Sequence, residues 1–449
     1  MAQRGQETGD LSVNSGVYEV DDGIGAFRSG IPDRGRSPTC WGKESMPSRT
    51  HDVIVVGGGN LGAGLLQGCA ARGWRTLGIE REGIAAQTSS RSSKLIHGGL
   101  RYLETAQFSL VRESLRERRI LRRIAPGLVD LVPFHIPVYR GARRGPWLIR
   151  SGLSLYALLG GCHRENRFRS LPEEEWSSLD GITTEGMRAI YRYWDGQTDD
   201  AALTAAVITS ARALGAEFHA PAEFLRAERT DRLHHVTYRC GEGEEHASAP
   251  VLLLAAGPWL NEARARCSPP LPEITVDLIQ GTHIEVAGEL SGGIYYLEAL
   301  ADQRPMFVMP WRGRTLVGTT EMRRDHATEC AASDEEIEYL TETFAHYFPE
   351  RDATVLEAWA GLRVLESADG AANRRSREAI IDQVEIGDTA LLSIAGGKLT
   401  GYRALAEERI RAFERFLPRV PPLERTDQIP LTEAGECARP TSANGPFDD

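Results

Sequence analysis

The chain has 449 residues, of which 41% are apolar and 26% charged, so a sizeable core is expected and a disulfide-stapled miniprotein or a wholly disordered chain is excluded. Its 52 basic and 63 acidic residues give a net charge of −11. An acidic surface is repelled by phosphate backbones, which argues against nucleic acid as a partner.

The spacing of the cysteines and the length of the apolar runs indicate the cellular compartment of the protein. The seven cysteines form no CxxC pair and no zinc-finger spacing with histidine, so neither a metal site nor a disulfide framework is expected. No apolar run approaches the roughly 20 residues of a membrane span, and the N-terminus lacks the layout of a signal peptide. These features predict a cytoplasmic protein.

Both ends of the chain lack hydrophobic periodicity. Residues 1–50 are rich in Gly, Ser, Arg and Asp and are predicted to be a disordered extension, with Met46 as a second candidate start. Residues 417–449 are expected to form a flexible tail. The folded unit is therefore predicted to cover about 51–416.

The folded unit begins with a buried strand over 52–56, a helix over 61–72 and a strand over 75–80. Apolar residues at near-helical spacing predict a helix over 108–124. The elements expected after it are a helix over 201–214, a buried strand over 251–256, antiparallel strands over 274–286, 306–310 and 314–319, and a last buried strand over 390–394 that leads through Gly396-Gly397 into a helix. This mixture predicts an α/β fold with a strand-rich second part.

A glycine-rich turn joins the first strand and helix. Gly57, Gly59 and Gly62 form a G-x-G-x-x-G pattern, and Glu80 ends the next strand. Glycines allow a tight turn and close approach of a pyrophosphate, the helix N-terminus supplies free N–H donors, and the acid can bind ribose hydroxyls. The pattern predicts an adenine-dinucleotide site.

Lysine is rare in this chain. Only Lys43, Lys94 and Lys398 are lysines among the 52 basic residues. Where a generic positive charge suffices the chain uses arginine, so the remaining lysines are candidates for a role that needs a compact ammonium.

The segment from Thr88 to Glu104 reads TSSRSSKLIHGGLRYLE, and it has little apolar content to form a core. It closely resembles the hallmark run of the FAD-dependent glycerol-3-phosphate dehydrogenases. The resemblance continues over the folded unit in separate blocks at 278–283, 310–311, 318–320, 361–363 and 396–403.

The resemblance implies a glycine-oxidase-like and D-amino-acid-oxidase-like flavoprotein with a Rossmann-type FAD-binding domain and an antiparallel-sheet substrate domain. The expected FAD-binding segments are 51–130, 196–270 and 383–416, and the expected substrate-binding segments are 131–195 and 271–382. The implied reaction is oxidation of sn-glycerol 3-phosphate to dihydroxyacetone phosphate, with electrons passed to a membrane quinone. Contact with the inner face of the cytoplasmic membrane and a homodimer are further expectations.

The candidate site residues come from the glycine-rich turn with Glu80, from these blocks, from the segment 255–259, which resembles the family's turn beside FAD, and from Arg377, which matches a family arginine. The candidate catalytic and substrate-binding residues are His97, Arg101, His283, Arg363, Arg377 and Lys398. The candidate cofactor-binding residues are Gly57, Gly59, Gly62, Glu80, Thr88, Ser89, Ser93, Lys94, His97, Gly98, Gly257, Gly397, Lys398, Leu399 and Thr400. Arginine forks suit phosphate oxygens, and a cation at Lys398 beside a helix start favours a reduced flavin.

Three departures from the family pattern are visible. Gln280 stands where lysine is usual, and Glu321 stands where aspartate is usual. The C-terminal helical domain of the larger relatives is not expected here. Gln280 and the domain that is not expected favour one alternative, a flavin-binding homologue without catalysis that has an assembly or regulatory role. An oxidase that uses oxygen is a second alternative, because oxygen access depends on a few atoms that the sequence does not identify.

Residues 140–159 mix arginines with Trp147, Leu148 and other apolar residues. Such a segment is typical of a helix at a membrane surface. A helix that packs its apolar face on the core fits the pattern equally well.

Overall fold

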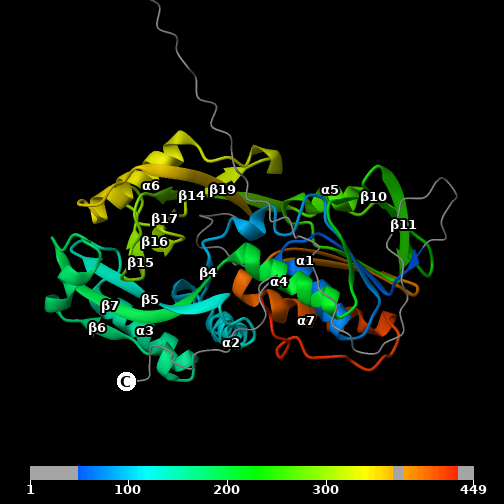
Figure 1. The fold of residues 1–449 in the computed structure, drawn as a ribbon, viewed down its shortest axis with the longest axis horizontal. Coiled ribbons are helices and arrows are strands. Elements are labelled where there is room, and N and C mark those ends of the chain that lie inside the picture. The colour runs from blue at the N-terminus through cyan, green and yellow to red at the C-terminus, as the bar shows by residue number, and fades with distance from the viewer. Residues whose placement is uncertain (1–48, 368–377, 433–449) are drawn as a thin grey trace, which may run out of the picture. The chain divides into compact units, whose positions relative to one another are not determined.

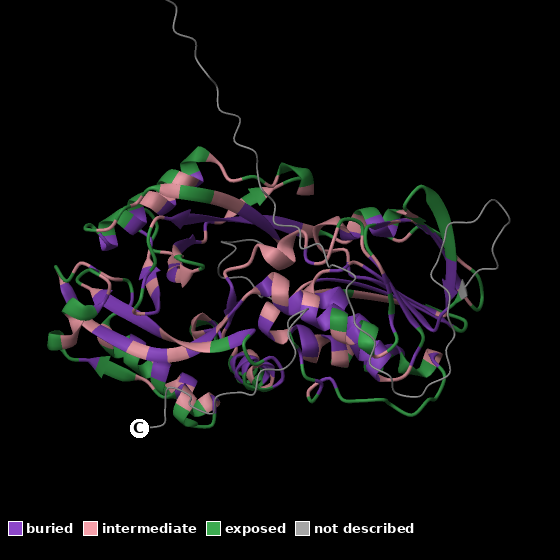
Figure 2. Ribbon diagram, in the orientation of Figure 1, coloured by how far each residue is buried: buried purple, intermediate pink, exposed green. Residues whose placement is uncertain are grey.

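The computed structural model of the chain describes residues 49–367 and 378–432 (Figure 1). One sheet has six strands, in the order β20 (Ala379–Ile386), β21 (Thr389–Gly396), β12 (Val251–Leu254), β2 (Val53–Val56), β3 (Thr76–Ile79) and β8 (Glu217–His219). From β21 to β8 the neighbours run parallel, whereas β20 runs antiparallel to β21. Parallel strands are usually covered on both faces, and β2, β3 and β12 are buried throughout (Figure 2).

Two layers cover this sheet, and alternate residues of β2 face each of them. Val53 and Val55 pack with helices α1 (Asn60–Ala71), α4 (Asp200–Ala213) and α7 (Tyr402–Phe413). Ile54 and Val56 belong to a core shared with a five-stranded sheet and the short helix α5 (Leu260–Ala265). The five strands, in order, are β1 (Arg49–Thr50), β11 (Gly243–Ala249), β10 (His234–Cys240), β9 (Ala222–Arg229) and β13 (Cys267–Ser268).

A third sheet has ten strands. Its main path is β18 (Met322–Arg324), β14 (Val276–Val286), β17 (Arg314–Gly318), β16 (Pro305–Trp311), β15 (Ile294–Glu298), β5 (Val129–Tyr139), β7 (Met187–Thr198) and β4 (Leu95–Ile96), while β19 (Val355–Glu366) pairs with β14 and β6 (Arg169–Leu171) with β7. Helix α6 (Asp334–Tyr347) packs in one core on this sheet. Helices α2 (Phe108–Ile124) and α3 (Pro146–Leu159) pack in the other.

The expected elements are confirmed to within two residues at each end, with one exception. The helix expected directly after Gly397 begins only at Tyr402, after a 3₁₀ turn over Leu399–Gly401. Gly396 and Gly397 both have positive φ, 75° and 79°, so the chain turns in a left-handed conformation before a helix can start.

The expected division into domains stays a prediction, and two strands pair with a sheet outside their expected segment. Strand β4, inside the expected segment 51–130, pairs with β7 of the ten-stranded sheet. Strand β20 begins at Ala379, before the expected boundary at residue 383, and pairs with β21 of the six-stranded sheet.

The ends of the described chain are more ordered than expected. Of the extension over 1–50, residues 49–50 form β1 beside β11, and Met46 lies outside the described residues. Residues 417–432 of the expected flexible tail pack on the fold. Trp74 Nε1 donates a hydrogen bond to the Pro418 carbonyl (3.0 Å), and Leu431 is buried. A few apolar residues, Leu417, Ile429 and Leu431, are buried in this segment. They do not follow a helical or strand period, so hydrophobic periodicity does not predict their burial.

Helix α3 packs one face on the core, and its contact with a membrane surface stays a prediction. Ile149, Leu153 and Tyr156 are buried in the core of the ten-stranded sheet. Trp147 and Leu148, however, are 81% and 60% exposed. Among the described residues, no helix has both the length and the apolar character needed to cross a membrane.

Candidate active site

The turn between β2 and α1 is closed by backbone contacts that leave no room for side chains. A Cβ at Gly57 would lie 2.3 Å from the carbonyl oxygen of Ala255, and Gly57 has a φ of 115°. A Cβ at Gly62 would lie 2.0 Å from the Gly57 carbonyl oxygen. Glu80 fixes the same turn, because its carboxylate accepts a hydrogen bond from the backbone N–H of Gly58 (2.6 Å). The N-cap residue of α1, Gly59, has no side chain, as close approach of a pyrophosphate requires. Oγ of Ser89 accepts a hydrogen bond from the N–H of Asn60, the first residue of α1 (2.9 Å).

A long cavity of about 340 Å³ begins at this turn. The predicted site residues that line it are Gly57, Gly59, Glu80, Thr88, Ser89, Ser93, His97, Gly257, His283, Arg363, Gly397, Lys398, Leu399 and Thr400. Residues 80–88 lie toward the turn, whereas the imidazoles and cations come from other strands and loops. The cavity thus joins a dinucleotide-type turn to a cluster of titratable side chains.

Two predicted glycines are needed for packing and do not line the cavity. Gly62 lets α1 approach the turn, as described above. A Cβ on Gly98 would lie 2.3 Å from the hydroxyl oxygen of Tyr156. Both glycines therefore allow close packing at the walls of the site.

Lys94 also does not line the cavity, and its assignment as a cofactor ligand stays a prediction. Its Nζ lies 2.7 Å from Oδ1 of Asp200, and the ammonium sits 5.3 Å and 5.0 Å from the ring centres of Trp311 and Trp359. A buried carboxylate holds the charge, so the scarcity of lysine here marks a structural ammonium.

Of the four predicted substrate cations, two line the cavity. They are Arg363 and Lys398, and Nζ of Lys398 lies 3.5 Å from the centre of the Tyr102 ring. Arg101 does not line it, and its guanidinium carbon lies 5.8 Å from the same ring. Arg377 lies outside the described residues.

His97 is held through its backbone. Its N–H donates to Oγ1 of Thr400 (3.1 Å), and that hydroxyl lies 3.3 Å from the His97 carbonyl oxygen. This contact joins the segment after β4 to the turn that carries Lys398.

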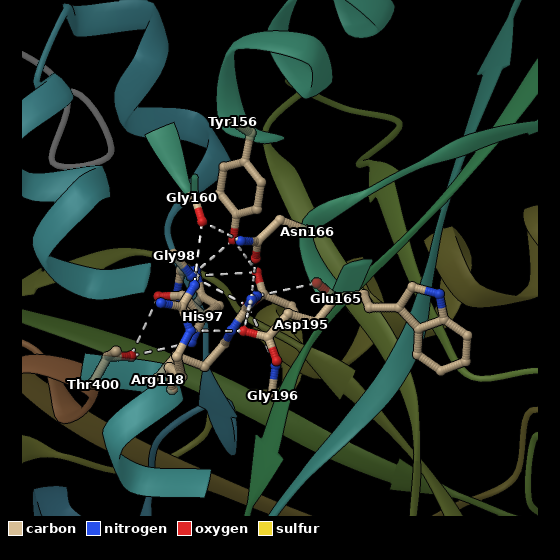
Figure 3. A network of polar contacts seen from close by, with 12 residues as sticks. His97, Gly98, Arg118, Tyr156, Gly160, Glu165, Asn166, Asp195, Gly196 and Thr400 are labelled. Atoms are coloured by element: carbon tan, nitrogen blue, oxygen red, sulfur yellow. Dashed lines mark hydrogen bonds and ion pairs between the residues drawn. The ribbon is translucent and has the colours of Figure 1, made fainter. Parts of the chain in front are cut away.

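A buried polar network supports the next residue (Figure 3). The Gly98 N–H donates to the Tyr156 hydroxyl (3.0 Å), which itself donates to Oδ2 of Asp195 (2.6 Å). Nη1 of Arg118 lies 2.6 Å from Oδ1 of the same carboxylate. Burial raises the pKa of Asp195, and Arg118 opposes that rise. Three elements, α2, α3 and β7, thereby fix the loop that presents His97.

His283 reaches the cavity from β14 and is stacked on Trp359 at 4.3 Å. Its Nε2 lies 3.0 Å from Oγ of Ser93. Burial, together with the charges of Lys94 and Arg363, lowers the pKa of His283 well below its usual value. This imidazole is therefore neutral at neutral pH.

Gln280, which replaces the lysine usual in the family, does not face the cavity, so the replacement removes no charge from the cavity lining. Gly281 and His283 line the cavity, and side chains alternate along a strand, so Gln280 points to the other face of β14. There its amide donates to Oε2 of Glu336 (2.6 Å) and accepts from Nε of Arg324 (3.0 Å).

Several cavity residues were missed from the sequence. Tyr102 lies within the TSSRSSKLIHGGLRYLE run, so that motif could have indicated it, and Thr319 lies in the block at 318–320. Trp259 follows Gly257 in the segment 255–259, which resembles the family's turn beside FAD, so that resemblance could have indicated it. Asp200 carries no such signal, because the fold brings it to the cavity from a distant segment.

The fold and cavity define a class, that of flavin- or nicotinamide-type dinucleotide-binding α/β oxidoreductases. The family model for FAD dependent oxidoreductases (DAO) matches residues 52–403. The chain belongs to this family, and within it to the relatives of the FAD-dependent glycerol-3-phosphate dehydrogenases. The expected fold class and the cofactor, FAD, are confirmed.

Three similar proteins illustrate the relationship. A glycerol-3-phosphate dehydrogenase of Synechocystis is 34% identical over 414 residues, which is 87% of this chain and 75% of that protein. A D-erythritol 1-phosphate dehydrogenase of Brucella abortus is 34% identical over 83% of this chain and 75% of its own length. The structure of the glycerol-3-phosphate dehydrogenase from Bacillus halodurans complexed with FAD matches with a TM-score of 0.64 and 25% identity, covering 85% of this chain and 68% of that one.

The residues present fit FAD. The turn at Gly57 and Gly59, which has no side chains at these positions, and the N-terminus of α1 suit the pyrophosphate. Glu80 lines the cavity close to the turn, where a ribose would lie, and Gly397 and Lys398 line it beside the imidazoles. The chain is thus an FAD-dependent oxidoreductase.

Proposed function

We propose that the protein oxidises sn-glycerol 3-phosphate to dihydroxyacetone phosphate. The observation that carries this proposal is the convergence of two imidazoles, His97 and His283, and two cations, Arg363 and Lys398, on one FAD-type cavity. Oxidation of a phosphorylated secondary alcohol needs a base for the hydroxyl proton and cations for the phosphate. The relatives named above act on phosphorylated polyols by their names, which supports the same substrate class.

Each of these residues receives a role from its surroundings. Arg363 and Lys398 bind the phosphate dianion. His97 accepts the hydroxyl proton, since the strongly lowered pKa of His283 makes that imidazole a weak base at neutral pH. His283, tied to Ser93, instead offers a neutral hydrogen-bonding edge. FAD, when bound, supplies the hydride acceptor.

The substrate proposal is tested by steady-state turnover with a dye as electron acceptor. We expect glycerol 3-phosphate to have a kcat/KM at least about 100-fold above that of unphosphorylated glycerol, because a desolvated dianion on two cations contributes several kcal/mol. D-Erythritol 1-phosphate is the second candidate, on the strength of the Brucella relative. Faster turnover of that four-carbon substrate would replace glycerol 3-phosphate in the proposal.

A quinone is the proposed acceptor, with helix α3 as the part that contacts the membrane. Trp147 and Leu148 are 81% and 60% exposed, and Leu158 is 64% exposed at the other end of the helix. Arg143 and Arg150 are exposed nearby. Exposed aromatic and apolar side chains beside cations are suited to an anionic lipid surface.

Vesicle sedimentation tests this contact. The purified protein should sediment with vesicles that contain phosphatidylglycerol, and the double variant Trp147→Ser/Leu148→Ser should stay in the supernatant. Leu356→Ser, which alters a 51% exposed leucine on β19, serves as the control. Equal sedimentation of the double variant and the control would rule out α3 as the contact.

A further inference from the structure

A second arginine lies behind Arg363. Arg304 immediately precedes β16 and does not line the cavity. Its Nη2 lies 3.2 Å from Oε2 of Glu321, and the two side chains are 10% and 11% exposed. Nε of Arg304 is buried and has no hydrogen-bond partner among the described residues. Burial of the Arg304 guanidinium costs solvation free energy, and the ion pair with Glu321 offsets part of that cost.

Glu321 reaches Arg363 with its other oxygen. Oε1 lies 3.3 Å from Nη1 of Arg363, and Nη2 of Arg363 donates to the carbonyl oxygen of Thr320 (3.0 Å). A Cβ on Gly281 would lie 2.5 Å from Nη2 of Arg363. An acid, a carbonyl and a bare glycine thus fix the plane of the Arg363 guanidinium.

The charges at this position do not cancel. One carboxylate faces two guanidiniums, and Lys398 lines the same cavity. Among these four side chains the excess is positive, so Glu321 orients Arg363 without cancelling the positive charge of the group. A neutral side chain at position 321 would remove the carboxylate that both guanidiniums contact.

We propose that Glu321 and Arg304 are positioning residues that hold Arg363 ready for the phosphate of the substrate. The proposal rests on the function proposed above, in which Arg363 binds that phosphate. Arg304 fixes Glu321, and Glu321 fixes Arg363. Glu321 contacts each arginine with a different carboxylate oxygen.

The test uses the FAD-loaded protein and measures the Kd of inorganic phosphate by calorimetry, the KM and kcat with glycerol 3-phosphate, and the melting temperature. Arg304→Gln and Glu321→Gln should each raise the Kd of phosphate and the KM by about five- to tenfold, while kcat changes less than about twofold. The double variant Arg304→Gln/Glu321→Gln should have the same Kd and KM as Glu321→Gln alone, because Arg304 acts on Arg363 only through Glu321. Glu321→Asp, which keeps the charge, should lie between Glu321→Gln and the wild type.

Glu285→Gln is the matched control. Glu285 lies in the same sheet, is also 11% exposed and pairs with Arg314 at 3.0 Å, but it does not line the cavity. The melting temperature of the Glu285→Gln variant should fall about as much as that of Glu321→Gln, while its Kd for phosphate stays unchanged. If Arg304→Gln does not retain FAD, Arg304→Lys, which keeps the charge but loses the fork, should show the same rise in Kd to a smaller extent.

Two outcomes overturn the positioning role. One is a wild-type Kd of phosphate in Arg304→Gln, or in Arg304→Lys if that variant is used. The other is an increase in Kd for Glu285→Gln as large as that for Glu321→Gln. If the wild-type protein binds phosphate but does not oxidise glycerol 3-phosphate, the proposed function fails while the phosphate affinities still decide the role of Glu321 and Arg304.

Discussion

Lys94 and Asp200 form a buried ion pair that joins the segment before β4 to the first residue of α4, with 2.7 Å between Nζ and Oδ1. The other carboxylate oxygen accepts a hydrogen bond from the backbone N–H of Ser92 (2.9 Å). Asp200 itself lines the cavity. The pair therefore sets the position of a wall of the FAD cavity although the ammonium does not face it.

Lys94→Met should lower the free energy of unfolding by roughly 3 kcal/mol, since it leaves a buried carboxylate without its partner. Burial raises the pKa of Asp200 and Lys94 opposes this rise. Urea denaturation followed by tryptophan fluorescence measures the loss. The double variant Lys94→Met/Asp200→Leu should regain much of it, and a double variant as unstable as Lys94→Met would show that the charge of Asp200 is not the cause.

Substitution of Lys398, in contrast, should lower turnover more than it lowers stability. Lys398→Met removes a cation that lines the cavity, and Lys398→Arg places a larger planar group where Nζ lies 3.5 Å from the Tyr102 ring centre. Both variants should lower turnover by at least about tenfold, or roughly 1.4 kcal/mol, with a smaller effect on FAD content. Wild-type turnover in Lys398→Arg would mean that any cation suffices.

The Tyr156 hydroxyl is expected to matter for turnover as well as for stability. Tyr156→Phe removes the group that accepts from Gly98 and donates to Asp195, and it should lower the free energy of unfolding by about 1–2 kcal/mol. Because the loop that carries His97 loosens, kcat should fall by about three- to tenfold. In the control Tyr139→Phe, whose hydroxyl donates to the Thr183 carbonyl, stability should fall similarly while kcat does not. Equal kcat values for the two variants would count against a positioning role.

Stability should decrease in mild acid, in part through His234. Burial lowers the pKa of this histidine to about 4, whereas an unfolded chain has a histidine pKa of about 6.5. The unfolded chain therefore binds the extra proton, and the stabilisation is lost as pH falls from about 6.5 toward 4. Between pH 7.5 and pH 5 the wild type should lose about 2 kcal/mol more than His234→Gln in urea denaturation. Parallel losses would exclude His234 as the group responsible.

Local patterns predicted the part of the site that is built from contiguous residues. The turn at Gly57 and the acid at Glu80 follow from one strand, one turn and one helix. Their roles depend on backbone geometry that glycine spacing reveals directly.

Contacts between distant segments could not be predicted in this way. The partner of Lys94 is 106 residues away in the sequence, and the sequence therefore could not distinguish a buried ion pair from a cofactor ligand. The link from Arg304 through Glu321 to Arg363 depends on three segments brought together by the ten-stranded sheet. Only the register of that sheet places one carboxylate between two arginines.

The most direct test of the account is anaerobic addition of one equivalent of glycerol 3-phosphate to the FAD-loaded protein, with the flavin absorbance at about 450 nm as the signal. We predict stoichiometric loss of this absorbance and formation of dihydroxyacetone phosphate, and recovery of the absorbance with a quinone faster than with air. Recovery that is faster with air would favour an oxidase. A flavin that stays oxidised at saturating glycerol 3-phosphate, in protein with full FAD content, would contradict the account.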